Sequence, residues 1–185
     1  MKSISPEPAL LGFLQDEPLH GYDLHKQVVS NLGAVWRLGL SQMYAILKEY
    51  EARGLIKTIV VASQTGRPQR KLLKLTPQGK RAFEAWMHQS AHGLREFRVD
   101  FFARLYFARA AGGPALRAFL KQQISSTRDE YETLGEKEPP SEFAGVVVGF
   151  RRAQLEAILE WLETLSQAQN IKQDRPHPKT LKADV

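Results

Sequence analysis

The sequence predicts a mostly α-helical protein with one small β-hairpin, in which the N-terminal half carries the hairpin and the C-terminal half is built from helices alone. Apolar residues recur at helical spacing over most of the 185 residues. One stretch rich in β-branched residues, 55–62, is followed by a turn cluster and a second short apolar run. Clusters of Gly and Pro at 111–114 and 138–141 then divide the second half into separate helices.

Three helices are expected before the hairpin. The first covers residues 9–14 and ends before Pro18, because the residue that precedes a proline disfavours the helical conformation. The second covers residues 20–32. The third is the best defined, since it begins at Ser41, a residue type that caps helix N-termini, and ends at the glycine C-cap Gly54.

The hairpin is expected to join residues 55–62 to residues 69–75 through a turn that contains Gly66. Thr76 and Pro77 then predict a capped start for a further helix, because proline is favoured at the first helical position. Three helices, a basic hairpin and another helix are the order of a winged helix-turn-helix. The predicted fold class is therefore mostly α with a small β-hairpin wing.

The sequence further predicts a winged helix-turn-helix over residues 1–92, a helical dimerisation domain over 93–168 and a flexible tail over 169–185. The middle and last helices of the second half each carry an apolar stripe with residues three or four apart, the spacing of a packed helix seam. Such stripes leave more apolar surface than three short helices can cover, which predicts a homodimer. The expected dimerisation residues are Leu116, Leu120, Val148, Leu155, Ile158 and Leu162.

Charge is concentrated in the N-terminal half. The net charge is +6, and residues 41–81 hold nine basic side chains against two acidic ones. Such a segment suits a polyanionic partner such as double-stranded DNA. The chain has no cysteine, no apolar run long enough to span a membrane and no targeting segment, so we expect a cytoplasmic protein.

Several separated motifs resemble one family. The segments LHGYDLHKQV, SQMYAILKEYEARGLIKT and TGRPQRKLLKLTPQGKRAF are similar, in this order, to the PadR family of transcriptional regulators. The segment FRVDFFARLYFA and the two long helices after it are similar to the virulence-activator-like branch of that family. Two departures stand out: Leu72 and Leu73 replace two tyrosines that are frequent in the wing, and Gln42 and Met43 stand where residues of the Gly-Ser-Leu type are common.

The resemblance implies a homodimeric DNA-binding regulator, in the first instance a repressor, that reads an inverted-repeat operator. Because the first residues of a recognition helix lie at base edges, Gln42 is the expected base reader, through a bidentate amide pair with adenine. Arginines of the wing are expected to contact phosphate or the minor groove, because the planar guanidinium can donate to two oxygens. We expect Tyr22 to pack between helices. The candidate DNA-binding residues are Ser41, Gln42, Tyr44, Lys48, Gln64, Thr65, Arg67, Arg70 and Lys71.

Aromatic residues gather near the junction of the two halves. They are interpreted first as ordinary core, because apolar stripes at helical spacing usually reflect packing. The resemblance also allows a pocket for a small aromatic effector. The candidate pocket residues are Trp86, Phe97, Phe101 and Tyr106.

Other site chemistries find little support. His88 and His92 lie four residues apart, but a zinc site requires three or four ligands, so no metal and no cofactor are expected. No catalytic motif occurs, which predicts that the protein is not an enzyme. The alternative to a DNA-binding regulator is a winged-helix small-molecule sensor or protein-interaction module that does not bind DNA. The basic excess over residues 41–81 favours the regulator.

Overall fold

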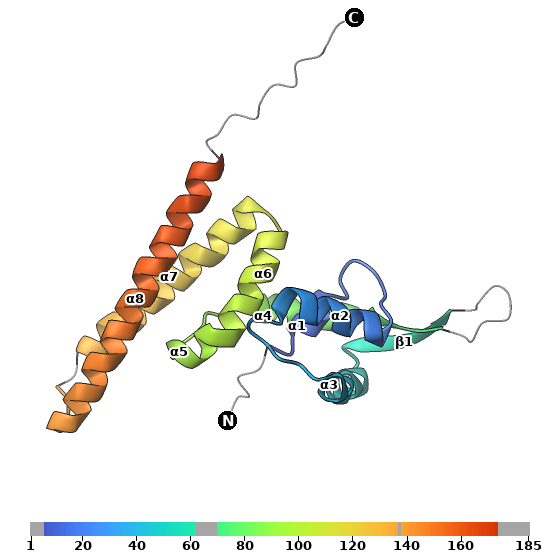
Figure 1. The fold of residues 1–185 in the computed structure, drawn as a ribbon, viewed down its shortest axis with the longest axis horizontal. Coiled ribbons are helices and arrows are strands. Elements are labelled where there is room, and N and C mark those ends of the chain that lie inside the picture. Colours follow the sequence, from blue (N-terminus) through green and yellow to red (C-terminus); the bar gives the residue numbers. More distant parts are fainter. Residues whose placement is uncertain (1–5, 62–69, 137, 174–185) are drawn as a thin grey trace, which may run out of the picture. The chain divides into compact units, whose positions relative to one another are not determined.

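The computed structural model describes residues 6–61, 70–136 and 138–173. The chain forms two compact units, Met1–Ala111 and Gly112–Val185, which we describe one at a time (Figure 1). The predicted fold class is confirmed: the described residues are mostly helical and contain one two-stranded antiparallel hairpin.

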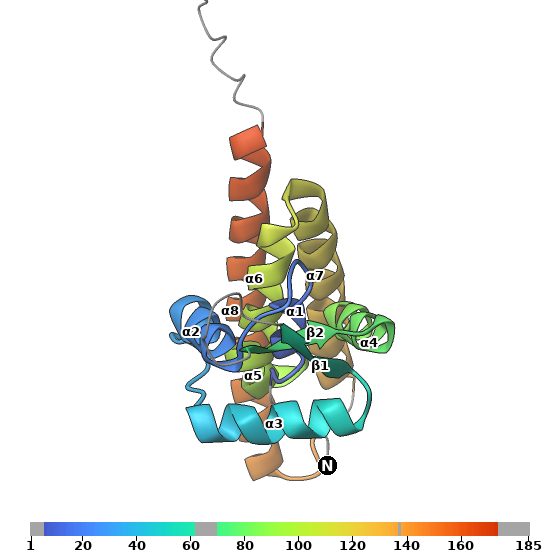
Figure 2. The same ribbon diagram turned by 90° about the vertical axis from the view of Figure 1, so that its right-hand side faces the viewer.

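The N-terminal unit has the element order expected of a winged helix-turn-helix, extended by a further helical segment. Figure 2 shows its hairpin between α2 and α4, with α3 crossing below. Its elements are α1 (Ala9–Gly12), α2 (Gly21–Leu32), α3 (Leu40–Ala52), β1 (Ile56–Val61), β2 (Arg70–Leu75), α4 (Pro77–Met87), α5 (Gly93–Glu96), the π-helical η1 (Phe97–Phe101) and α6 (Phe102–Ala110).

The C-terminal end of α3 is fixed by a glycine, as the sequence predicts. Gly54 has φ +69°, a left-handed conformation that glycine adopts without steric cost. The Leu55 N–H donates to the carbonyl oxygen of Tyr50 at 2.9 Å, and the Gly54 N–H donates to that of Glu51 at 3.0 Å. This pair of bonds is a Schellman motif, which ends the helix and directs the chain into β1.

The beginning of α3 differs from the prediction. The N-cap is Gly39, which contributes no side-chain cap, and Ser41 lies inside the first helical turn. Ser41 was therefore wrongly interpreted as the cap. Because Leu40 already adopts the helical conformation, the Ser41 hydroxyl is left on the exposed surface of the helix.

Thr76 caps α4 as predicted and also ties this helix to the hairpin. Its Oγ1 accepts a hydrogen bond from the Gly79 N–H at 3.0 Å and donates to the carbonyl oxygen of Gly54 at 2.7 Å. Pro77 follows at the first helical position. A single hydroxyl thus joins the start of α4 to the end of α3.

β1 and β2 pair in register from Ile56 opposite Leu75 to Val61 opposite Arg70. Leu73 also exchanges backbone hydrogen bonds with Leu19, at 2.8 and 3.1 Å, so the loop before α2 lies along the outer edge of β2. These bonds fix the base of the wing against the helices.

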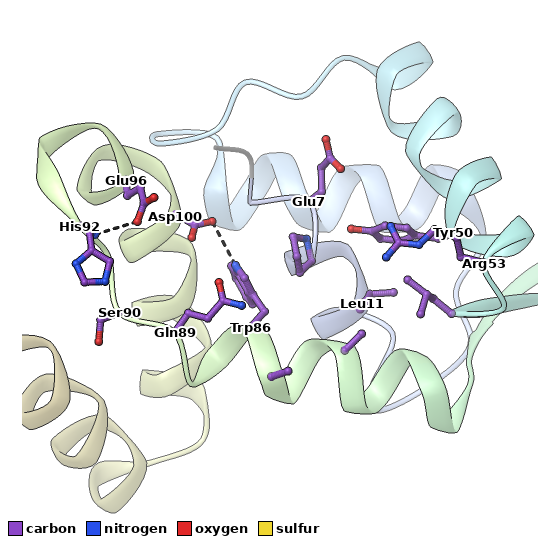
Figure 3. Close-up of a pocket in the computed structure, with 14 residues that line it drawn as sticks. Glu7, Leu11, Tyr50, Arg53, Trp86, Gln89, Ser90, His92, Glu96 and Asp100 are labelled. Atoms are coloured by element: carbon purple, nitrogen blue, oxygen red, sulfur yellow. Dashed lines mark hydrogen bonds between the residues drawn. The ribbon is translucent and has the colours of Figure 1, made fainter. Parts of the chain in front are cut away.

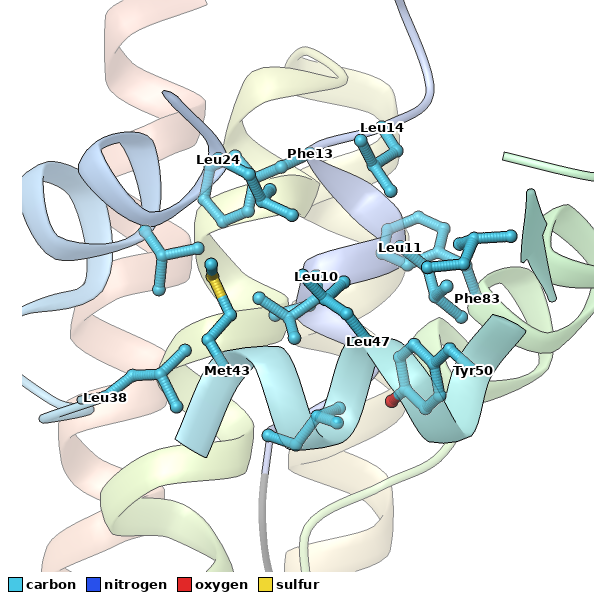
Figure 4. Close-up of a cluster of buried hydrophobic side chains, with 14 of the residues drawn as sticks. Leu10, Leu11, Phe13, Leu14, Leu24, Leu38, Met43, Leu47, Tyr50 and Phe83 are labelled. Carbon is cyan, nitrogen blue, oxygen red and sulfur yellow. The ribbon is translucent and has the colours of Figure 1, made fainter. Parts of the chain in front are cut away.

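The core of the N-terminal unit is formed by side chains from α1, α2, α3 and α4 (Figure 4). Leu10 of α1, Leu24 of α2 and Met43 of α3 are fully buried. Phe107 of α6 joins the same core, with its ring 5.2 Å from that of Phe13 and 5.1 Å from that of Phe83. Because α6 packs in this way, residues 93–111 lie in the N-terminal unit, although the sequence analysis assigned them to the helical domain.

The C-terminal unit is a hairpin of two long helices, α7 (Gly113–Gly135) and α8 (Glu142–Gln173) (Figure 1). Arg152 of α8 donates to the Tyr131 hydroxyl of α7 at 3.1 Å and lies 4.6 Å from its ring centre. Helix α8 continues to Gln173, past the predicted start of the tail at residue 169, because this polar stretch contains no helix breaker. Within the described ranges, no helix is both long enough and apolar enough to span a bilayer.

Candidate nucleic-acid interface

Helix α3 presents one polar face to solvent and one apolar face to the core. Met43, Ile46, Leu47 and Tyr50 are buried. The side chains of Ser41, Gln42, Tyr44 and Lys48 are exposed. Ser41, Tyr44 and Lys48 follow at intervals of three and four residues, so they share one face of the helix, and Gln42 lies at its edge. The structure thus leaves all four residues predicted on this helix accessible to a partner.

Tyr44 also contacts the beginning of α2. A Cβ atom at Gly21 would lie 2.7 Å from the Tyr44 hydroxyl oxygen, so a larger residue at position 21 would require the Tyr44 ring to shift. The side chain of His20 caps α2 and accepts a hydrogen bond from the Tyr22 N–H at 3.2 Å. The positive end of the α2 dipole and the exposed hydroxyl of Tyr44 therefore lie on one surface.

Tyr22 is placed differently from the prediction. Instead of packing between helices, its side chain is 60% exposed at the first turn of α2. It is an additional candidate for this surface that the sequence analysis missed. The available signal was its place in the first turn of the predicted helix 20–32.

The turn between α2 and α3 is tied to α2 by a side chain. Nε2 of His25 donates to the carbonyl oxygen of Leu38 at 2.9 Å. Leu38 lies two residues before α3, and its side chain is buried in the core. His25 thus helps to fix where the recognition helix begins.

In the part of the wing that the structure describes, basic side chains lie on both faces of the hairpin. Arg70 lies opposite Val61 and Lys71 opposite Val60, and both basic side chains are exposed. Because successive residues of a strand point to opposite faces, Arg70 and Lys71 do not share a face. The predicted wing residues Gln64, Thr65 and Arg67 lie outside the described residues.

The predicted aromatic effector residues have different surroundings in the N-terminal unit. Phe97 and Phe101 are buried and stack on each other with ring centres 4.5 Å apart. Tyr106 packs against Phe13 at 5.6 Å. Of the four predicted residues, Trp86 alone lines a cavity of about 720 Å³ in the N-terminal unit (Figure 3).

Trp86 belongs to a buried polar cluster beside that cavity. Its Nε1 donates to Oδ1 of Asp100 at 3.2 Å. Oδ2 of Asp100 lies 3.2 Å from Nη2 of Arg104, a close ion pair that lacks hydrogen-bond geometry. Burial lowers the pKa of the Arg104 guanidinium, and the charge of Asp100 opposes this effect. The Arg104 side chain also donates to the carbonyl oxygen of Gln89, which joins α6 to the end of α4.

The predicted dimerisation residues fall into two groups. Leu116, Leu120, Leu155 and Leu162 are buried in the single chain, whereas Val148 and Ile158 are half-buried. The large exposed hydrophobic side chains of α8 are others, namely Phe143, Val146, Phe150 and Trp161.

His88 and His92 lie at the end of α4 and just before α5. In the part of the chain that the structure describes, no group of three or more His, Asp or Glu side chains has the arrangement needed to hold a metal ion.

Residues 10–85, which include the α2–α3 pair and the hairpin, match the model of the Transcriptional regulator PadR-like family. The N-terminal unit belongs to this PadR-like family. A curated relative, the negative transcriptional regulator PadR of Bacillus subtilis (strain 168), is 25% identical over 170 residues, which cover 85% of this chain and 93% of the relative. The family assignment agrees with the prediction of a regulator rather than an enzyme.

Two crystal structures of Bacillus subtilis PadR are among the similar solved structures. The complex with operator DNA is 21% identical, with a TM-score of 0.44 and coverage of 88% of this chain and 98% of that chain. The complex with p-coumaric acid is 20% identical, with a TM-score of 0.41 and coverage of 92% and 98%.

Proposed function

We propose that this member of the PadR-like family is a sequence-specific repressor that binds double-stranded DNA in the cytoplasm. The observation that carries the proposal is the exposed face of α3, on which Ser41, Tyr44 and Lys48 are accessible. The acidic residues of α3 occur only in its last turns, so no carboxylate of α3 itself opposes DNA at the N-terminal end of this helix. The relative from Bacillus subtilis is named a negative regulator, which supports repression.

The proposed contacts with DNA have two different roles: one side chain reads a base, and the others bind phosphates. Gln42 reads a base edge in the major groove, since its amide can donate to and accept from adenine at once. Tyr44 and the beginning of α2 bind a phosphate between them, because the tyrosine hydroxyl and the helix dipole both favour an anion. Arg70 and Lys71 bind backbone phosphates from the wing, where an exposed cation contributes affinity without reading sequence.

The protein is proposed to act as a homodimer through the C-terminal unit. Phe143, Val146 and Phe150 are 76%, 65% and 63% exposed in the single chain. Their intervals of three and four residues place them on one face of α8. An exposed apolar stripe of this kind marks a protein contact site, and a second copy of the same helix offers the same stripe.

A two-fold dimer sets the form of the operator. Two recognition helices related by a two-fold axis meet equivalent half-sites, so the operator is an inverted repeat with half-sites about 10 base pairs, or a multiple of that, apart. Effector control belongs to the same proposal, because Bacillus subtilis PadR has been crystallised with p-coumaric acid.

Selection from fragmented genomic DNA tests the proposal. Fragments retained by the purified protein would be sequenced at low and at moderate salt. The expected result is enrichment of an inverted repeat at both salt concentrations, with an affinity for random duplex that falls steeply as salt rises.

The same experiment separates the alternative function. A winged-helix sensor or protein-interaction module without DNA binding would retain no fragment above background at any salt concentration. Retention of random fragments without a shared sequence would contradict sequence-specific reading and leave a general DNA-binding protein.

A further inference from the structure

Leu40 is an exposed leucine in the first turn of the recognition helix. Its side chain is 40% exposed, whereas the other large non-aromatic apolar side chains of α3, namely Met43, Ile46 and Leu47, are all buried. Leu40 and Tyr44 are four residues apart, so Leu40 shares the accessible face of α3 with Tyr44. The face that the proposed function assigns to DNA therefore contains one large aliphatic side chain.

The backbone on both sides of Leu40 is fixed. Before it, the side chain of Leu38 is buried and the carbonyl oxygen of Leu38 accepts the hydrogen bond from His25. After it, the Met43 N–H donates to the carbonyl oxygen of Gly39 at 3.0 Å. Figure 4 shows Leu38 and Met43 in the same core. A side chain presented from such an anchored turn is rigid enough to distinguish bases that differ by one methyl group.

The neighbours of Leu40 favour DNA over an apolar protein surface. Arg37, Ser41 and Gln42 are exposed and polar, and the chain has no acidic residue from position 24 to position 48. A hydrophobic protein contact needs a patch of adjoining apolar groups, which the exposed residues beside Leu40 in α3 do not provide. In the major groove, by contrast, the apolar group on offer is a single one, the C5 methyl group of thymine.

We propose that Leu40 reads a thymine of the operator, through contact between its side chain and the C5 methyl group in the major groove. An aliphatic side chain forms no hydrogen bond with a base edge, so the methyl group is the feature that it can recognise. Leu40 thereby adds one base position per half-site to the one that Gln42 reads. This inference rests on the proposed function, because it requires DNA at the N-terminal end of α3.

The expected contribution of this contact is moderate. Burial of one methyl-sized apolar group changes an affinity about fourfold. A dimer on an inverted repeat makes the contact twice, so removal of both methyl groups should weaken binding about 15-fold. A change of this size is measurable, and it is separable from hydrogen bonding if the methyl group alone is removed.

Replacement of thymine by deoxyuridine tests the contact directly, because uracil keeps the hydrogen-bonding groups of thymine and lacks its methyl group. Each symmetric pair of thymines in the operator selected from genomic DNA would be replaced in turn. Binding of the full chain to each duplex would be measured by fluorescence anisotropy. At least one pair should weaken binding by the wild-type protein about 15-fold. Less than a twofold loss at every pair would overturn the proposal.

A matched pair of variants assigns the effect to Leu40. Leu40→Ala should bind the thymine operator about 15-fold more weakly than the wild type and lose its response to deoxyuridine at the identified pair. Leu94→Ala makes the same substitution on a leucine of α5 that is 45% exposed, and should keep both the affinity and the response. A purely structural role of Leu40 would weaken both duplexes alike. A full response to deoxyuridine in Leu40→Ala would therefore overturn the contact.

Failure of this inference is distinguishable from failure of the proposed function. A wild-type protein that selects no DNA sequence would contradict the proposed function and the Leu40 contact together. A wild-type protein that binds its selected operator equally well with and without every thymine methyl group would overturn the Leu40 contact alone.

Discussion

The two units expose different kinds of aromatic side chain. On the N-terminal unit, the exposed aromatic residues beside the recognition helix are Tyr22 and Tyr44, each with a hydroxyl that can bind a phosphate. On α8 of the C-terminal unit they are led by Phe143 and Phe150, which have no polar group. The difference indicates that the first surface meets a polar, charged partner and that the second meets an apolar one.

The largest expected effect concerns the interior of the N-terminal unit, whose core is complete in one chain. Leu10 is fully buried in that core, and Leu10→Ala should lower the free energy of unfolding by about 2–5 kcal/mol. Urea unfolding followed by circular dichroism measures this loss, which should not depend on protein concentration. A loss below about 1 kcal/mol would show that the core is not packed as described.

The next effect concerns the exposed stripe of α8. Phe150→Glu should weaken self-association by about 100-fold, because a charge would have to be buried in an apolar contact. Sedimentation at several protein concentrations measures the change. Gln167→Glu, an exposed position on the same helix, is the control and should leave association unaltered.

A dimer that survives Phe150→Glu with its affinity intact would show that another surface joins the two copies. Leu155→Glu is a poor test of the same question. Leu155 is buried in the single chain, so a charge there would damage the C-terminal unit itself.

The smallest effect concerns a single hydroxyl in the N-terminal unit. Thr76→Ala removes the cap of α4 and the bond to Gly54, and should cost about 1 kcal/mol of stability. Thr76→Ser keeps the hydroxyl and should recover most of this loss. Thermal unfolding compares the two variants, and equal melting temperatures would show that the methyl group of Thr76, rather than its hydroxyl, matters.

Local signals in the sequence predicted the elements of the N-terminal unit well. Thr76-Pro77 and Gly54 each act through a few neighbouring residues, so their effect can be inferred without knowledge of the fold. Ser41 was misassigned because Gly39, which has no capping side chain, already starts the helix. A serine near the predicted start of a helix does not prove that it is the cap, because the helix can begin at an earlier residue.

The spacing of apolar residues was less informative about which face of a helix packs within the chain and which stays exposed. Helix α8 carries one apolar stripe through Leu155 and Leu162, which are buried, and another through Phe143 and Phe150, which are exposed. Both have helical spacing, so the pattern predicts two contacts without assigning a partner to either. Of the residues that line the cavity beside Trp86, the sequence predicted Trp86 alone, because the walls come from α3, α4 and η1, which are distant in sequence.

The most direct test of the account compares Gln42→Ala and Arg70→Ala on the selected operator, on operators with each base pair replaced and on random duplex. Gln42→Ala should relax the preference at one symmetric position per half-site, at a cost of about 1–3 kcal/mol against the preferred base and little against random DNA. Arg70→Ala should weaken operator and random duplex nearly alike and flatten the salt dependence by about one unit for each phosphate that is no longer bound. An unchanged preferred sequence in Gln42→Ala together with an altered one in Arg70→Ala would contradict the account, because the wing would then be the reader.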